Sequence, residues 1–318
     1  LWYIENSRKQ TAMKRDPHQI LPQANLTQHT TRRPETNNHL DAVLEQAKDQ
    51  LHLQMLLIEV ASCDDGADFA LIARAYDFAR LRHEGQHRKS GHPFLQHCVE
   101  VARLLAQLRM NDTTVAAGLL HDVIEDTTAT YEEVSNLFGH KIADLIDGVT
   151  KIDRFTYESR EERQAETYRK MLLSMVKDIR VILIKLVDRL HNMRTLDYIG
   201  ADAQERIARE TVEVYAPLAH RFGLARIRWE LEDRSLKFLH PEVYSELREK
   251  VSMKRRERED YIEEFKKPIE ADLQKSRIES EIGGRPKNFF SIYNKMKARE
   301  KPFEEIYDVL AIRIIVDS

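Results

Sequence analysis

The sequence has 318 residues, more than one small core needs, so two domains are expected. Apolar residues make up 42% and charged residues 32%, which excludes a membrane or collagen-like protein, and only 10 glycines and 9 prolines favour a helix-rich chain. The formal charge of −3 gives no global attraction to nucleic acid or to an anionic membrane. Two cysteines, Cys63 and Cys98, suit a reducing cytoplasm better than a disulfide framework.

Residues 1–40 are polar and lack a sustained apolar period, so we expect a disordered leader. No stretch approaches the roughly 18 apolar residues of a membrane span, and no export signal is evident. These patterns predict a cytoplasmic protein. The sequence begins with Leu1 and stops at Ser318 directly after an apolar run, so we expect a fragment of a longer protein.

Apolar side chains recur at helical spacing from residue 40 to residue 250, without a convincing strand, which predicts an all-α domain. The helices are predicted at residues 67–81, 94–108, 112–126, 161–176 and 178–193, with two short helices in 131–149 hinged near Gly139. Asp112 is expected to cap the helix that it begins. The segment 178–193 is apolar enough to be a central buried helix.

A change of composition near residue 283 predicts a second domain. Residues 217–239 continue as helix, and 242–267 form a long charged helix. A basic run at 283–301 is followed by β-branched residues at 308–317, which are typical of a strand. The predicted divisions are a leader (1–40), an all-α domain (41–200), a helical connector (201–245) and the incomplete start of an α/β domain (246–318).

The strongest chemical signal is the segment HDVIED at 121–126, on a predicted helix. Asp122, Glu125 and Asp126 are three or four residues apart, so one flank of the helix would carry three carboxylates beside His121. A bound cation would turn the repulsion among these carboxylates into attraction. An acidic, solvated helix end is the alternative interpretation.

Asp188 lies within an otherwise apolar helix, where an unpaired carboxylate would cost several kcal/mol. Asn192 and Thr195 continue a polar stripe along the same face. The alternative to a functional role is a structural ion pair with a core arginine, Arg189 or Arg194.

His97 is likewise a polar side chain within an apolar helix, where a hydrogen-bonded core histidine is the alternative. Two imidazoles and two carboxylates from three helices together form a mixed nitrogen and oxygen set: His97, His121, Asp122 and Asp188. Such a set suits a divalent ion with open positions for water and substrate, whereas a structural zinc site favours thiolates. Manganese is our first choice; iron, zinc and magnesium stay open.

The segment HEGQH at 83–87 matches the H-E-x-x-H pattern of zinc proteases, which needs one continuous helix. Gly85 and the following RKSGHP instead indicate a helix end entering a loop. In that loop Arg88, Lys89 and Ser90 offer two cations and exposed backbone N–H groups, which suit phosphate or pyrophosphate. An ordinary basic turn is the alternative.

Several motifs occur in the order found in one family: HEGQHRKSG (83–91), GLLHDVIEDT (118–127), DGVTKI (147–152), DIRVILIKLVDRLHNMRTL (178–196), PLAHRFGLARIRWELED (217–233), GRPKNFFSIYNKM (284–296) and IYDVLAIRIIV (306–316). Through them the sequence resembles the N-terminal half of RelA/SpoT homologues, the stringent-response enzymes that make and destroy (p)ppGpp. The resemblance implies a mainly α fold: an all-helical hydrolase domain of the HD superfamily, followed by a truncated α/β nucleotidyltransferase-like synthetase domain.

The implied reaction removes the 3′-pyrophosphate of ppGpp or pppGpp and gives GDP or GTP plus pyrophosphate. Matching motif positions assign the metal ligands to His97, His121, Asp122 and Asp188, with Mn²⁺ as the ion, and the hydrolytic acidic pair to Glu125 and Asp126. Nucleotide contacts match Arg88, Lys89, Asn192 and Thr195, and Ser90 joins them as a substrate-binding candidate. Cys98 stands where many relatives have proline, a change that should leave the ligand geometry intact.

On the synthetase side the matching positions are Arg285, Lys287 and Ser291 for the ATP-side motif, Lys295 on the same basic face, and Asp308 as the first Mg²⁺ carboxylate. The second acidic residue would lie beyond Ser318, so synthesis is expected of the full-length parent and not of this chain. The expected partners are guanine nucleotides, with a ribosome contact only through missing C-terminal regions and no binding of membrane or DNA. A catalytically silent, nucleotide-sensing regulatory module is the alternative function.

Overall fold

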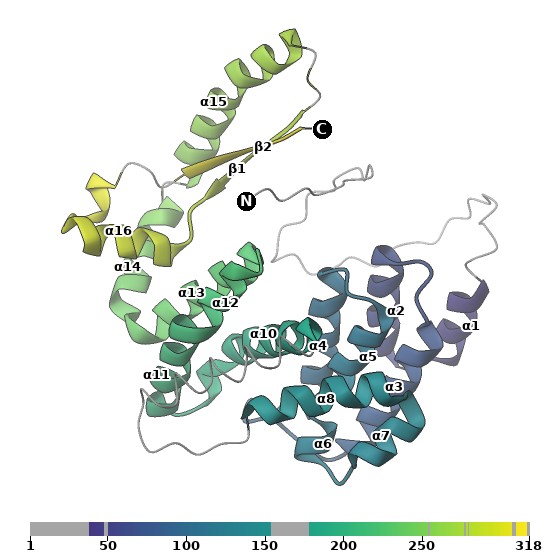
Figure 1. Ribbon diagram of the computed structural model, residues 1–318. Helices are drawn as coiled ribbons and strands as arrows, with labels where there is room; N and C mark the ends of the chain where they lie inside the picture. Colours follow the sequence, from purple (N-terminus) through teal and green to yellow (C-terminus); the bar gives the residue numbers. More distant parts are fainter. Residues whose placement is uncertain are drawn as a thin grey trace.

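The computed structural model describes residues 38–47, 50–153, 178–253, 255–276, 278, 280–306 and 310–316 (Figure 1). Before residue 280 this described part contains helices and turns, apart from one isolated bridge between His87 and Pro93. The mainly α fold is therefore confirmed. Residues 1–37 of the expected leader and the predicted helix 161–176 lie outside the described residues.

The first helices are α1 (Asn38–Gln46), α2 (Leu51–Cys63), α3 (Phe69–Arg82), α4 (Phe94–Gln107), α5 (Asp112–Leu120), α6 (Val123–Asp126), α7 (Tyr131–Phe138), α8 (His140–Asp153) and α10 (Ile179–Arg194). They are followed by α11 (Ala201–Glu210), α12 (Ala216–Arg221), α13 (Ala225–Leu239), α14 (Pro241–Met253), α15 (Arg255–Lys275), β1 (Ser280–Pro286), α16 (Phe289–Arg299) and β2 (Leu310–Val316). Short helical turns lie at Leu196–Tyr198, Thr211–Tyr215 and Phe303–Glu305.

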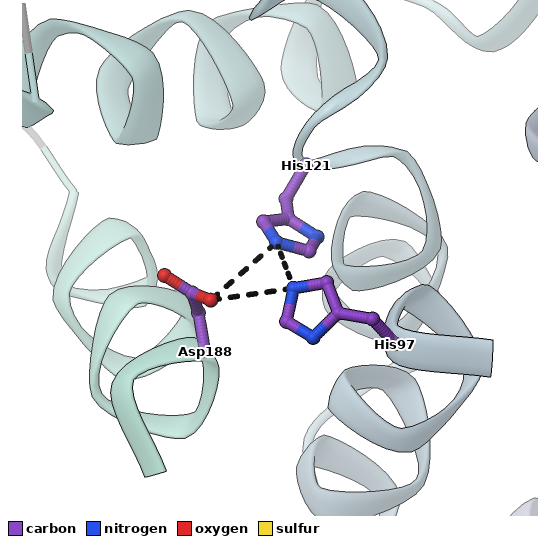
Figure 2. Close-up of side chains that lie close together, drawn as sticks. All are labelled: His97, His121 and Asp188. Atoms are coloured by element: carbon purple, nitrogen blue, oxygen red, sulfur yellow. Dashed lines mark hydrogen bonds and ion pairs between the residues drawn. The ribbon is translucent and has the colours of Figure 1, made fainter. Parts of the chain in front are cut away.

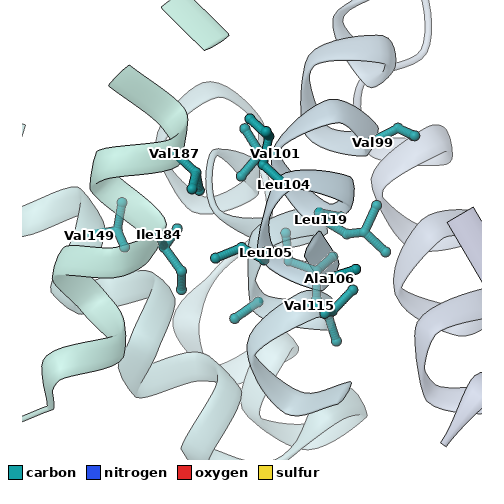
Figure 3. Close-up of a cluster of buried hydrophobic side chains, with 14 of the residues drawn as sticks. Val99, Val101, Leu104, Leu105, Ala106, Val115, Leu119, Val149, Ile184 and Val187 are labelled. Carbon is teal, nitrogen blue, oxygen red and sulfur yellow. The ribbon is translucent and has the colours of Figure 1, made fainter. Parts of the chain in front are cut away.

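The main hydrophobic core lies where α4 and α5 meet α8 and α10 (Figure 3). Leu105 on α4, Leu119 on α5 and Ile184 on α10 are fully buried there. Burying each such side chain contributes about 1.5–3 kcal/mol to the free energy of unfolding. The prediction that the segment 178–193 forms a central buried helix is confirmed by α10. Packing in this core fixes the relative positions of α4, α5 and α10.

The predicted helix 112–126 is wrong as a single element, because α5 ends at Leu120 and the short helix α6 follows a turn. Nδ1 of His121 is 2.9 Å from the carbonyl oxygen of Gly118, which in a continuous helix would accept from the N–H of residue 122. The side chain therefore competes for the backbone acceptor at the break. The cap also differs from the prediction: the side chain of Asn111, not Asp112, accepts from the N–H of Thr114 at 3.1 Å.

Two glycines with positive φ separate helices along the chain. Gly139, at φ +88°, divides α7 from α8, which confirms the predicted hinge. Gly223, at φ +71°, lies between α12 and α13, so the continuous helix predicted over 217–239 is wrong. A left-handed backbone favours glycine and ends a helix. The predicted helix 242–267 corresponds to α14 and α15, on either side of residue 254.

The strands β1 and β2 form an antiparallel pair in which Ser280 faces Val316 and Pro286 faces Leu310. The strand predicted at 308–317 is confirmed by β2. The strand β1 was not predicted, because Gly283, Gly284 and Pro286 are poor strand formers and only pairing with β2 compensates for them.

Helix α13 contributes to two cores, with Leu231 in the main one and Leu236 in a second with Leu247, Ile292 and Phe303. It also holds the start of α16. The Asp233 carboxylate accepts the N–H of Phe290 at 2.9 Å, and burial raises the pKa of Asp233 to about 6. The predicted domain boundaries stay a prediction, since α13 joins both parts of the chain.

We expect Gly118→Ala to destabilise the protein. A Cβ at Gly118 would overlap Cδ1 of the fully buried Leu105 and would lie 3.6 Å from Cα of Ala102. Overpacking of about 1–3 kcal/mol should outweigh a helix-propensity gain of at most about 1 kcal/mol. Chemical denaturation measures the change. Gly200→Ala is the matched control, because a Cβ there meets nothing within 4 Å; equal stability of both variants would contradict this packing.

Candidate metal centre

Three buried side chains from separate parts of the fold meet at one point (Figure 2). His97 comes from α4, His121 directly follows α5, and Asp188 comes from α10. Nε2 of His97 lies 3.2 Å from Nε2 of His121 and 3.3 Å from Oδ1 of Asp188. Nε2 of His121 lies 3.9 Å from the same carboxylate oxygen. The two ring nitrogens and the carboxylate therefore face a common centre.

Asp122 adds a fourth donor atom to this cluster. Its Oδ2 is 3.0 Å from Nε2 of His121 and 3.4 Å from Nε2 of His97. Two donor atoms about 2.1 Å from one ion lie about 3.0–3.4 Å apart at angles of about 90–109°. Four of the five separations among these ligand atoms, 3.0–3.4 Å, lie in this range, and the fifth, 3.9 Å between His121 and Asp188, is wider. His97, His121 and Asp188 form one group whose ligand atoms all lie within 4.8 Å of one another, and Asp122 lies beside it through its contacts with the two imidazoles.

The hydrogen bonds of His121 test whether these residues fit a metal. Its Nδ1 lies 2.9 Å from the Gly118 carbonyl, so Nδ1 carries the proton and the electron pair of Nε2 faces the two carboxylates. That electron pair and the two carboxylates repel one another, and without an ion a proton on Nε2 relieves the repulsion. Burial lowers the pKa of His121, but the charges of Asp122 and Asp188 outweigh burial and raise this pKa to about 9. A site that draws a proton so strongly is one that a metal cation fits.

Asp188 is held on both of its oxygens. Lys185 Nζ donates to Oδ2 at 3.0 Å, and the Asn192 amide donates to Oδ1 at 2.6 Å. Burial raises the pKa of Asp188, but the charge of Lys185 and the nearby imidazoles hold it well below its usual range.

Burial likewise raises the pKa of Asp122, but the charges and hydrogen bonds of His121 and His97 outweigh burial and hold this pKa well below its usual range, so both carboxylates stay ionised. The arginine partners considered for Asp188 are wrong. Arg189 pairs with Glu210 at 3.2 Å, and Arg194 pairs with Glu230 at 2.7 Å.

The loop after α3 rules out the zinc-protease interpretation of HEGQH. The helix ends at Arg82, and Gly85 has a φ of +75°, so His83 and His87 do not share a helix. The bridge between His87 and Pro93 then closes a tight loop beside α4.

Arg88 connects this loop to the metal-binding candidates. One Nη donates to the amide oxygen of Asn192, and the amide N–H of Asn192 donates to Asp188. The guanidinium lies over the Phe94 ring. Its other Nη is buried without a hydrogen-bond partner among the described residues, and so is the hydroxyl of Ser90. Unsatisfied buried donors cost about 1–3 kcal/mol each, so the loop is suited to an incoming anion.

The remaining substrate candidates lie around this loop and along α10. Lys89 is exposed, next to Arg88. Thr195 caps the C-terminus of α10, where its hydroxyl donates to the His191 carbonyl at 3.3 Å. The structure therefore joins Arg88 directly to Asn192, whereas it places Thr195 at the end of the same helix.

Glu125 and Asp126 lie on α6, exposed to solvent one turn after Asp122. The N–H of Asp126 donates to the Asp122 carbonyl at 2.8 Å, and the Gln86 amide donates to the Asp126 carbonyl at 2.9 Å. Although the residue is largely exposed, partial burial of its carboxyl, followed by the negative charge of Asp122, raises the pKa of Asp126. This carboxyl is thus biased towards accepting a proton.

Two buried residues of α10 that contact the cluster, Lys185 and His191, were not predicted from the sequence. Each lies three residues from Asp188, so helical spacing was the available signal. Nδ1 of His191 is 2.7 Å from Nδ1 of His97. Burial, followed by the charges of His97 and Arg88, lowers the pKa of His191 to about 3.

The synthetase-side candidates lie in β1 and α16, away from α4 and α5 (Figure 1). Arg285 is in β1, Lys287 follows it, and Ser291 and Lys295 are one turn apart on α16. Asp308 lies outside the described residues. Among the described helices, none is long and apolar enough to cross a membrane.

Two family profiles match this chain. One, described as an HD domain, matches residues 75–225, and one described as a region found in RelA / SpoT proteins matches residues 284–318.

The chain is also similar to curated proteins over most of its length. A probable guanosine-3′,5′-bis(diphosphate) 3′-pyrophosphohydrolase of Synechocystis sp. is 48% identical over 262 residues, which cover 82% of this chain and 34% of that protein. A GTP pyrophosphokinase of Myxococcus xanthus is 46% identical (79% and 34% covered). The bifunctional (p)ppGpp synthase/hydrolase SpoT of Escherichia coli is 47% identical (78% and 35% covered). This chain therefore spans about a third of the length of these relatives.

Among solved structures, this chain is similar to a metazoan SpoT orthologue that is described as hydrolysing ppGpp. The alignment covers 52% of this chain and 85% of the orthologue's chain. The identity is 26% and the TM-score 0.37, an overlap too small to bear on the fold.

We expect Lys185→Met to lower the free energy of unfolding in EDTA by about 3–5 kcal/mol, because it leaves the buried Asp188 carboxylate without its partner. The double variant Lys185→Met/Asp188→Leu should recover most of that loss. Lys151→Met is the matched control, since the exposed pair of Lys151 with Asp147 should be worth less than about 1 kcal/mol. Equal losses for the two single variants in urea denaturation would contradict the buried pair.

Proposed function

This chain belongs to the RelA/SpoT family, and on that basis we propose that its helical part removes the 3′-pyrophosphate of ppGpp or pppGpp, giving GDP or GTP plus pyrophosphate. One observation carries the proposal: the cluster of His97, His121, Asp122 and Asp188 is linked through Asn192 to the basic loop at Arg88. This arrangement supports the proposal, because the hydrolysis of a polyphosphate needs a metal ion next to a group that can bind an anion.

His97, His121, Asp122 and Asp188 would hold one divalent ion, and we propose Mn²⁺ because the donor set mixes imidazole nitrogens with carboxylate oxygens. When bound, the ion supplies Lewis acidity, which lowers the pKa of water and offsets phosphate charge. Lys185 keeps Asp188 ionised, and the Gly118 carbonyl keeps the electron pair of His121 directed at the ion site.

Arg88 and Ser90 would bind the pyrophosphate. A buried guanidinium N–H and a buried hydroxyl, neither with a partner among the described residues, would both be satisfied by phosphate oxygens. Asn192 orients the guanidinium, and the exposed Lys89 adds a second positive charge. We assign the remaining nucleotide contacts to Asn192 and Thr195, which both lie near the C-terminal end of α10.

Glu125 and Asp126 would orient the attacking water and accept its proton. The water oxygen forms a bond to the phosphorus attached to the ribose 3′ oxygen, and the bond from that phosphorus to the 3′ oxygen breaks. The departing oxygen takes up a proton and pyrophosphate leaves, so atoms and charge balance. The backbone bonds of Asp126 to Asp122 and Gln86 support this assignment, because they tie the carboxylate-bearing turn to both motifs.

In the whole protein we further propose a Mg²⁺-dependent GTP pyrophosphokinase activity. The proposed residues are Arg285, Lys287, Ser291 and Lys295 on the ATP side and Asp308 as a metal carboxylate. Guanine nucleotides and ATP are the only partners that this scheme requires. The two free cysteines, Cys63 and Cys98, agree with a cytoplasmic location.

With Mn²⁺ present, the chain should release pyrophosphate from ppGpp, and EDTA or Asp122→Ala should reduce the rate at least about 100-fold. Asp65→Ala removes an exposed carboxylate in the turn between α2 and α3 and should leave the rate unchanged. Pyrophosphate release in a coupled assay is the measurement. Tight ppGpp binding without turnover would contradict the hydrolase and favour the nucleotide-sensing module.

Arg88→Ala should lower kcat/KM for ppGpp by about 10–100-fold, the value of one charge-assisted hydrogen bond of about 1.5–3 kcal/mol. Arg80→Ala is the matched control, because Arg80 is exposed on α3 and pairs with Asp77 at 3.5 Å. Initial rates across a range of ppGpp concentrations measure both variants. An unchanged kcat/KM for Arg88→Ala would contradict the assigned anion site.

A further inference from the structure

The His97 ring is bonded at both of its nitrogens. Its Nε2 faces His121, Asp122 and Asp188, while its Nδ1 lies 2.7 Å from Nδ1 of His191. The centroids of the two rings are 4.8 Å apart, and both side chains are buried. His191 is thus the hydrogen-bond partner on the side of His97 that faces away from the cluster.

Only one proton can lie between two nitrogens in hydrogen-bond contact. If Nδ1 of His97 carries it, Nε2 keeps its electron pair for an ion, and His191 must accept with its own proton on Nε2. If Nδ1 of His191 carries it, the proton of a neutral His97 moves to Nε2, where it would occupy the ion site. The tautomer of His191 therefore decides whether His97 can act as a ligand.

The other histidine of the cluster is fixed in the same way by a different group. Nδ1 of His121 lies 2.9 Å from the backbone carbonyl of Gly118, which can only accept. Histidine ligands in metal sites commonly donate their second N–H to such a partner, which fixes the tautomer and the ring orientation. His191 occupies the equivalent position for His97, but it is a side chain and can be substituted.

We propose that His191 is a positioning residue that accepts the Nδ1 proton of His97 and so directs the Nε2 electron pair of His97 at the ion. This inference rests on the proposed function, because it requires a metal at the cluster. The placement of His191 one turn from Asp188 on α10 lets one helix supply both a ligand and the support for another ligand. The Thr195 hydroxyl donates a hydrogen bond to the His191 carbonyl and so stabilises that turn of the helix.

Two substitutions of His191 separate acceptance of the proton from simple packing. His191→Asn places an amide oxygen near the position of Nδ1, whereas His191→Leu fills similar space without an acceptor. Calorimetric titration of the metal-free chain with Mn²⁺ should give a Kd about 10–100-fold weaker for His191→Leu and within about threefold of wild type for His191→Asn. Thermal unfolding in EDTA reports packing separately.

Wild-type affinity in His191→Leu, or equal weakening in both variants, would overturn the positioning role while leaving the metal centre in place. Failure of the wild-type chain to bind Mn²⁺ would overturn the metal centre itself and the role with it. If His191→Leu does not fold, long-range ¹⁵N NMR of the wild-type chain loaded with diamagnetic Zn²⁺ decides the matter. The proposal requires the proton of His191 on Nε2, and a proton on Nδ1 would overturn it.

Discussion

The convergence of four electron-rich side-chain atoms at one buried point is the constraint on which the site depends. Carboxylates and imidazole electron pairs within 3–4 Å repel one another unless a positive charge lies among them. The packing of α4, α5 and α10 opposes this repulsion and brings the ligands together. Gly118 contributes to the packing and to the orientation of a ligand. Its lack of a side chain leaves room for Leu105, and its carbonyl fixes the ring of His121.

Two cationic side chains, Lys185 and Arg88, are connected to the cluster through the carboxylate of Asp188. Lys185 holds the buried side of Asp188, and Asn192 links the other oxygen of that carboxylate to Arg88. The Asn192 side chain therefore connects the guanidinium of Arg88 to a proposed ligand of the ion by hydrogen bonds. A polyanionic substrate would meet a cation and a fixed donor whose relative positions are set before it arrives, which reduces the reorganisation that catalysis requires.

Sequence patterns predicted most of the helices, because α4, α8 and α10 each bury a face whose apolar residues repeat at helical spacing. The break after α5 was not predictable from periodicity, because the contact found there, from the His121 side chain to the Gly118 carbonyl, is not part of the apolar pattern. The strand β1 was missed for a related reason: its partner β2 is distant in sequence.

The sequence singled out His97 and Asp188 because an unpaired polar side chain inside an apolar helix is costly. It singled out His121 and Asp122 because they belong to the acidic segment at 121–126. The residues that support them were not predicted, because helical spacing puts Lys185 near Asp188 but does not show that Asp188 pairs with this lysine rather than with an arginine. The same holds for His191, whose partner is 94 residues away in the chain. The roles of the ligands and of Glu125 and Asp126 stay predictions.

Crystals grown with Mn²⁺ and measured near the manganese absorption edge would show where the ion binds. We expect one anomalous peak per chain, bounded by Nε2 of His97, Nε2 of His121 and the carboxylates of Asp122 and Asp188. Loss of that peak in crystals of Asp188→Ala would further support this position of the ion. A chain that releases pyrophosphate from ppGpp while its only bound manganese lies elsewhere would contradict the account.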